Sequence, residues 1–155
     1  MKHTRVLVLI LAAFFALPAA AQTASDMQIL AQKIKSDKKL VVAANLQLTE
    51  DEAKGFWPVY EAYQKELEGI NKRLLGTIKR YAEAYNKGPV SDETAKKLIN
   101  EAIAIEEAEV KLKRSYAPKL EKVVPGMKVA RYIQIENKIR AIGKYELAAQ
   151  IPLVQ

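Results

Sequence analysis

The chain has 155 residues, of which half are apolar and 28% are charged, with 25 Lys and Arg against 18 Asp and Glu. This balance is typical of a globular protein and excludes a disordered chain. Because the sequence contains no cysteine and a single histidine, disulfide bonding and redox chemistry by the chain itself are also excluded.

Residues 1–21 predict a secretory signal peptide. A basic start precedes an unbroken apolar run over residues 6–17, and three alanines at 19–21 end the segment. This is the order of a signal peptide, with cleavage expected after Ala21. The run is shorter than the roughly 20 apolar residues that cross a bilayer. We therefore expect export to the periplasm, a single mature domain of residues 22–155, and no stable membrane insertion.

Cleavage would also remove His3, so the mature chain would contain neither histidine nor cysteine. Histidine is the usual general base near neutral pH and the commonest metal ligand. Nucleophilic Ser–His–Asp and Cys–His systems and His/Cys zinc sites are thereby excluded. The sequence also lacks a Gly-rich phosphate loop and the Glu-x-x-His pairs of di-iron bundles. We expect no enzyme activity, no cofactor and no metal.

The mature sequence predicts helices throughout and no sheet. The first helix is expected over Asp26–Leu46. A second begins at Leu48-Thr49-Glu50-Asp51-Glu52, where Thr49 and Glu52 have the spacing of a capping box and acids occupy the first turn.

The second helix has the most regular apolar pattern in the chain. Its large side chains recur every three or four residues and form a narrow seam of the coiled-coil kind: Phe56, Tyr60, Tyr63, Leu67, Ile70, Leu74, Ile78, Tyr81 and Tyr85. Pro58 predicts a kink or a short separate first turn, because proline lacks a backbone donor. The segment 86–89, which contains Gly88 and Pro89, is expected to end this helix.

A third helix is expected to start after Ser91, bend near Pro118 and end around Val124. The fourth is expected over Met127–Ala149. The predicted fold is all-α, with about four long, kinked, antiparallel helices in a hairpin or a bundle.

Charged residues interrupt the apolar face of the third helix. Glu106, Glu109 and Lys113 lie at the centre of that face, and Glu109 and Lys113 have the i, i+4 spacing of an ion pair. Arg131, Glu136 or Arg140 of the fourth helix are the expected partners, because buried charges must be paired. Glu106, Glu109, Lys113, Arg131 and Glu136 are thus a candidate polar cluster, either a binding site or an internal ion network.

The fourth helix has two apolar faces, one of them formed by Val129, Ile133 and Leu147. A helix that is apolar on two sides is either central or in contact with two neighbours. We consider Val129, Ile133, Leu147 and also Trp57 as candidate protein-binding residues, with burial in the monomer as the alternative. Contact with a second copy would make a homodimer.

The signal, the small helical mature chain and the Leu48-Thr49 start of a helix resemble the LTXXQ periplasmic proteins of Spy and CpxP type, although Glu52 stands where that motif has Gln. The resemblance implies either an ATP-independent chaperone that binds protein clients or a regulatory module that binds one envelope protein. Basic residues alternate with acids on the helices, and an exported protein has no access to nucleic acid, so no nucleic-acid partner is expected.

Overall fold

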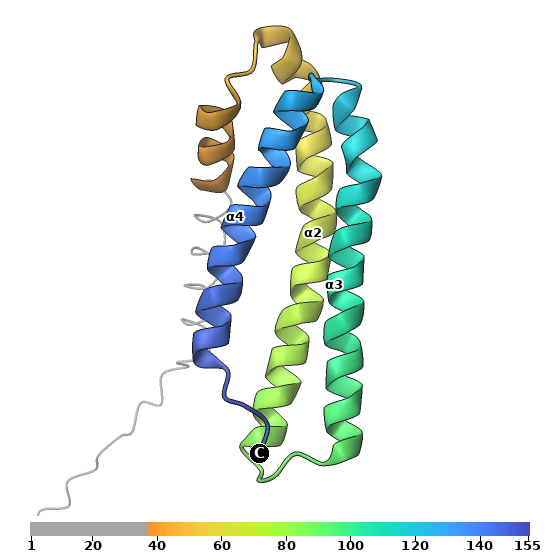
Figure 1. Ribbon diagram of the computed structural model, residues 1–155, viewed down its shortest axis with the longest axis vertical. Coiled ribbons are helices and arrows are strands. Elements are labelled where there is room, and N and C mark those ends of the chain that lie inside the picture. The colour runs from red at the N-terminus through yellow and green to blue at the C-terminus, as the bar shows by residue number, and fades with distance from the viewer. Residues whose placement is uncertain (1–36) are drawn as a thin grey trace, which may run out of the picture. The chain divides into compact units, whose positions relative to one another are not determined.

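The computed structural model describes residues 37–155, which are helical apart from short connections and a C-terminal tail (Figure 1). The chain divides into two units, Met1–Leu40 and Val41–Gln155. Residues 37–40 of the first unit are helical. The predicted signal peptide and the predicted helix start at Asp26 lie outside the described residues. The all-α prediction is confirmed, since no strand occurs in residues 37–155.

The second unit begins with a helical segment, residues 41–46, that ends where predicted, at Leu46. Gln47 follows it in the left-handed region with φ 49°. The predicted capping box then starts helix α2, because the Glu52 amide donates to Thr49 Oγ1 at 3.3 Å and the Thr49 amide donates to Glu52 Oε2 at 2.8 Å.

Helix α2 spans Glu50–Tyr85 and continues through Pro58 as one element. The alternative of a separate first turn is therefore wrong. A proline removes one backbone donor from a helix, so Pro58, the ninth residue of α2, leaves the Lys54 carbonyl without its usual donor, and the helix nevertheless continues past it.

Helix α3 spans Asp92–Glu121, and Ser91 caps it by accepting from the Thr94 amide at 3.3 Å. Pro118 lies inside the helix, which ends three residues before the predicted Val124. Helix α4 spans Gly126–Gln150 and follows a turn in which Pro125 offers no side-chain cap.

Helices α2 and α3 lie against each other along their length, whereas α4 approaches the backbone of α3 over a shorter stretch (Figure 1). Helix α4 reaches α2 mainly through long side chains. Lys128 Nζ, for example, contacts Glu52 Oε2 at 2.6 Å, and Gln64 Nε2 donates to the Tyr132 hydroxyl at 3.1 Å. Large side chains therefore fill the space between these two helices.

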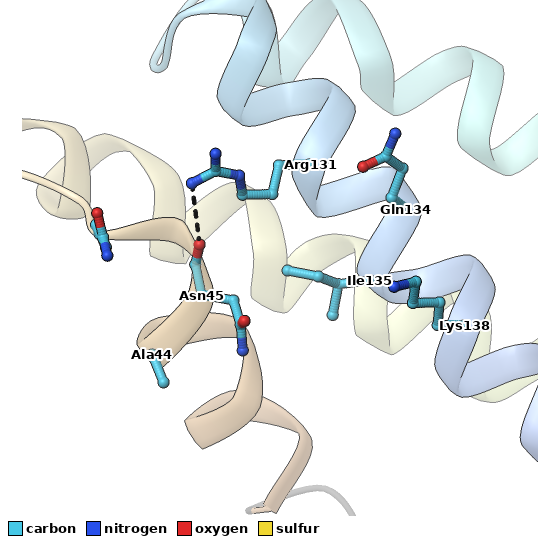
Figure 2. Close-up of a pocket in the computed structure, with 7 residues that line it drawn as sticks. Ala44, Asn45, Arg131, Gln134, Ile135 and Lys138 are labelled. Carbon is cyan, nitrogen blue, oxygen red and sulfur yellow. Dashed lines mark hydrogen bonds between the residues drawn. The ribbon is translucent and has the colours of Figure 1, made fainter.

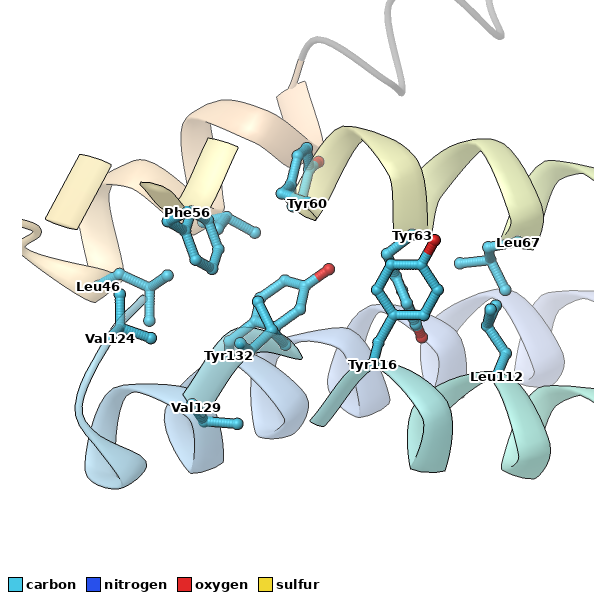
Figure 3. Packing of buried hydrophobic residues seen from close by; sticks show 12 residues of the cluster. Leu46, Phe56, Tyr60, Tyr63, Leu67, Leu112, Tyr116, Val124, Val129 and Tyr132 are labelled. Atoms are coloured by element: carbon cyan, nitrogen blue, oxygen red, sulfur yellow. The ribbon is translucent and has the colours of Figure 1, made fainter. Parts of the chain in front are cut away.

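The core gathers at the end of the unit where α2 starts and α3 ends (Figure 3). Five rings contact one another there at centroid distances of 5.3–6.0 Å, and we call them the aromatic end: Phe56, Tyr60, Tyr63, Tyr116 and Tyr132. Aliphatic side chains from the first helical segment, the α3–α4 turn and the start of α4 complete this cluster, among them Leu46, Val124 and Val129. Burial of rings contributes both apolar area and edge-to-face contacts to stability.

The backbone of α2 comes very close to the α3–α4 turn at Gly55. A Cβ added to Gly55 would lie 2.9 Å from Val123 Cβ. Only glycine permits this approach without a shift of the turn.

The opposite end of the unit is packed differently. We call it the distal half, and it consists of α2 after Asn71, α3 before Ile105 and α4 after Arg140. Of the described side chains in the distal half, only Thr77 is buried. The residues of the α2 seam that lie in this half, such as Ile78 and Tyr81, are half-buried.

Candidate functional site: a polar layer and an exposed face of α3

A layer of polar side chains separates the aromatic end from the distal half. Its centre is an ion pair between Glu109 of α3 and Arg140 of α4, in which Arg140 Nε donates to Glu109 Oε2 at 3.1 Å and Nη2 faces Oε1. Arg140 Nη1 also donates to Asn71 Oδ1 of α2. Burial lowers the pKa of Arg140, which reflects the cost of removing its charge from water. This one residue therefore links all three helices.

A second group in the layer joins α2 to α4. Gln64 Nε2 donates to Glu136 Oε1 at 2.8 Å as well as to the Tyr132 hydroxyl. Burial raises the pKa of Tyr132 and of Tyr63, and the nearby Glu136 carboxylate raises both further. Both phenols therefore stay neutral at ordinary pH, and the layer is a structural ion and hydrogen-bond network.

The structure divides the predicted polar cluster. Glu109 and Glu136 are buried in the layer, as the internal-network alternative requires. Glu106 is exposed and pairs with Lys144 at 3.1 Å. Lys113 donates to Asn137 Oδ1 at 3.1 Å, whereas Arg140, one of the partners expected from the fourth helix, pairs with Glu109. The prediction of one five-residue cluster is therefore wrong.

Arg131 is the remaining member, and it lies apart from the layer beside the first helical segment. Its Nη1 approaches the Asn45 carbonyl oxygen at 3.4 Å, and it lines a pocket of about 340 Å³ with Gln134, Ile135 and Lys138 (Figure 2). A cation at the C-terminal end of a helix complements the partial negative charge of its last carbonyls. Arg131 therefore caps the C-terminal end of the first helical segment.

The predicted protein-binding residues do not form one exposed face. Val129 is buried in the core, so it is unavailable to a partner, and Ile133 packs against the same cluster. Leu147 is half-buried in the distal half. Trp57 is half-buried, with its ring 5.1 Å from Phe56 and 5.3 Å from Tyr60. For Val129 the alternative of burial within the monomer holds.

An exposed apolar face that the sequence reasoning missed lies on α3. Ile99, Ile103 and Val110 have exposed fractions of 55%, 49% and 53%. At 100° per residue they fall within about 40° of one another on the helix surface. A shallow hollow of about 460 Å³ lies along this face, lined by Ile103 and Val110 together with four charged residues: Glu106, Glu107, Lys111 and Arg114.

This α3 face is well separated from the buried side of the same helix. The buried positions Ile105, Leu112 and Tyr116 lie about 120–160° around the helix from the centre of this face, at 100° per residue. The spacing of Ile99, Ile103 and Val110, four and seven residues apart, could have revealed this second apolar face in the sequence. It was overlooked because Ile99 also fits the inward apolar pattern with Leu98 and Ala102.

No helix of residues 37–155 is long and apolar enough to cross a membrane. Within the same range, no three or more Asp, Glu, His or Cys side chains group as metal ligands. No family model, curated protein or solved structure matches the chain.

Proposed function

We propose that the protein is exported to the periplasm and binds other proteins there without ATP, as a chaperone of the Spy and CpxP kind does. The α3 face carries this proposal. Three half-exposed aliphatic side chains in one stripe, flanked by charges of both signs, are what a binder of apolar polypeptide segments presents. The flanking charges keep such a surface hydrated when no client is bound.

Suppression of client aggregation tests this proposal. We expect the mature protein, at near-stoichiometric amounts and without ATP, to reduce light scattering of several chemically denatured clients. Ile103→Ser with Val110→Ser should weaken the effect, because it removes the centre of the stripe. The matched control is Leu75→Ser with Met127→Ser, which removes two apolar side chains elsewhere that are more exposed, at 59% and 76%. No suppression with any client would refute the chaperone proposal.

A dedicated protein partner is the second candidate, and the order of the charges favours it. Glu106 and Glu107 precede Val110, whereas Lys111 and Arg114 follow it. A fixed sequence of acidic and basic groups beside an apolar stripe selects the register of one partner. Glu107→Lys with Arg114→Glu should abolish capture of a single envelope protein while leaving general client binding intact.

Self-association through an exposed apolar face would make the homodimer that the sequence analysis considers. Sedimentation of the mature protein at several concentrations measures it. A molecular mass that stays at the monomer value throughout would count against this extension of the proposal.

A further inference from the structure

Helix α4 has an outer face that lies opposite its buried side. The buried residues Val129, Tyr132 and Glu136 lie about 120–180° around the helix from the centre of this face, at 100° per residue. Ile142 and Tyr145 on the face have exposed fractions of 65% and 73%. We call it the α4 face, and its five exposed residues fall within about 80° of one another on the helix: Arg131, Gln134, Lys138, Ile142 and Tyr145.

The first half of the α4 face borders the pocket of about 340 Å³ beside the first helical segment. Arg131 and Ile135 point from α4 towards that segment, where Asn45 lies (Figure 2). Gln134 and Lys138 also line the pocket, and no Asp or Glu is among its described lining residues. The pocket therefore offers two cations and several amide groups to a ligand, and no negative side chain.

The two cations of the α4 face have no carboxylate partner within residues 37–155. Lys138 makes no hydrogen bond or ion pair in this part of the chain, and Arg131 contacts the Asn45 carbonyl oxygen at 3.4 Å. Arg140 and Lys144, on another side of the same helix, pair with acids of α3. An acidic group that enters the pocket would thus meet two positive charges without displacing an existing ion pair.

The spacing of the α4 face favours a helix as its partner. Its residues follow one another at steps of three or four, which is the spacing at which two helices pack side by side. At 1.5 Å per residue the face is about 21 Å long, so a helix of about four turns covers it. The end with Arg131 and Lys138 requires acids on that helix, whereas Ile142 and Tyr145 require apolar side chains.

A second copy of α4 is a poor match for this face. In a parallel pair, or in an antiparallel pair that overlaps over the whole face, Lys138 would face Lys138 of the other copy. Like charges placed opposite each other disfavour such a contact. The charges of the α4 face therefore select a partner of different sequence.

We propose that the α4 face binds an amphipathic helix of another protein, with acids opposite Arg131 and Lys138 and apolar side chains opposite Ile142 and Tyr145. A carboxylate of that helix enters the pocket beside Asn45. This site shares no residue with the α3 face and does not depend on chaperone activity.

Binding of designed peptides tests this proposal. The probe is a fluorescein-labelled helical peptide whose packing side carries Glu in one half and Leu in the other, and the matched peptide has Lys in place of Glu. We expect fluorescence anisotropy to show that the mature protein binds the Glu peptide at least about tenfold more tightly than the Lys peptide. Added salt should weaken this binding, because exposed charges are screened.

Single substitutions on the α4 face locate the binding. Lys138→Glu should weaken binding of the Glu peptide by about tenfold, since it turns an attraction into a repulsion. Tyr145→Ser should weaken it by about threefold or more, because the ring would no longer be covered by the partner. Both side chains are exposed, so both variants should keep the helicity of the parent protein. The matched control is Lys65→Glu, which reverses an exposed charge on α2 and should bind normally.

Equal affinity for the Glu and Lys peptides, or normal binding by the Lys138→Glu protein, would overturn the proposal. Binding of phosphatidylglycerol vesicles in place of the Glu peptide would assign the face to a membrane surface and would also overturn it. Self-association that Tyr145→Ser abolishes would assign the face to a second copy, with the same consequence. Ile103→Ser with Val110→Ser, which alters the α3 face, should leave peptide binding unchanged, so the two proposals fail independently.

Discussion

The aromatic end and the distal half are built from the same three helices, yet they bury different fractions of their side chains. At the aromatic end, segments from all parts of the second unit converge on five contacting rings. In the distal half the helices pair through charged residues such as Arg73 and Glu101, and apolar side chains remain exposed. The comparison teaches that one helical unit can concentrate its buried side chains at one end and leave exposed apolar side chains at the other.

Alkaline pH should break the aromatic end first and with the largest effect. Burial raises the pKa of Tyr60 and of Tyr116 to about 12, and raises those of Tyr63 and Tyr132 as well. Because the folded pKa values exceed the unfolded value of 10.0, this stability is fully present below pH 10 and is lost as the pH rises towards 12.

A small domain has only marginal stability, so ionisation of phenols that are buried in the folded state favours unfolding. We expect cooperative unfolding between these pH values, followed by circular dichroism and by phenolate absorbance. Gradual phenolate formation with full helicity retained would contradict the burial of these rings.

Truncation of one side chain in each region should show that the aromatic end contributes more to stability than the distal half. Phe56→Ala should lower the free energy of unfolding by about 3–5 kcal/mol, since it leaves a cavity in a fully buried site. Ile142→Ala in the distal half is the matched control and should change it by less than about 0.5 kcal/mol, because that side chain is exposed. Urea unfolding measures both, and equal losses would remove the distinction.

The close approach at Gly55 gives a third test of the tight end. Gly55→Ala should destabilise the protein by about 1–3 kcal/mol, because the new Cβ would press on Val123. Gly69→Ala has open space around it and should instead stabilise α2 by up to about 1 kcal/mol. If Val123→Ala restores stability to the Gly55→Ala protein, the steric explanation holds; if it does not, another cause is required.

The smallest expected effect lies at the start of α2. Thr49→Ala should cost about 1 kcal/mol through the lost cap. The Lys128 ammonium, together with the Thr49 amide, lowers the pKa of Glu52. The Glu52 carboxylate therefore stabilises the folded state above the ordinary carboxyl pKa of 4.5, and this stabilisation is lost as the pH falls below that value. Glu52→Gln should flatten the acid limb of a stability–pH curve, and an unchanged limb would assign that limb to other carboxylates.

Much of the fold could be predicted because its signals are local. The capping box at Thr49, the cap at Ser91 and the helix end at Leu46 depend on a few neighbouring residues, and all three are confirmed. The seam of α2 could also be predicted, from the period of its apolar residues. The depth to which each seam residue is buried could not be predicted, because the burial of Phe56 and the half-exposure of Tyr81 depend on where α4 lies.

Partners across helices were harder to predict than positions along one helix. The sequence indicated that Glu109 needs a cation and offered Lys113 at i, i+4 as well as Arg131 and Arg140 on the fourth helix, and tertiary packing selects Arg140. The hydrogen bonds of Gln64 and Asn71 to α4 could not be predicted from the sequence, since an amide side chain on a helix is usually solvated. The exposed α3 face was missed because inward and outward apolar positions alternate on the same helix.

Trp57 is the single tryptophan of the chain, and its ring meets those of Phe56 and Tyr60 at 76° and 85°. Its emission therefore reports on the aromatic end. An unfolding curve recorded by tryptophan fluorescence would look two-state even if the C-terminal part of α4 detached at lower denaturant. A fluorescent label on Tyr145→Cys would make that second transition visible.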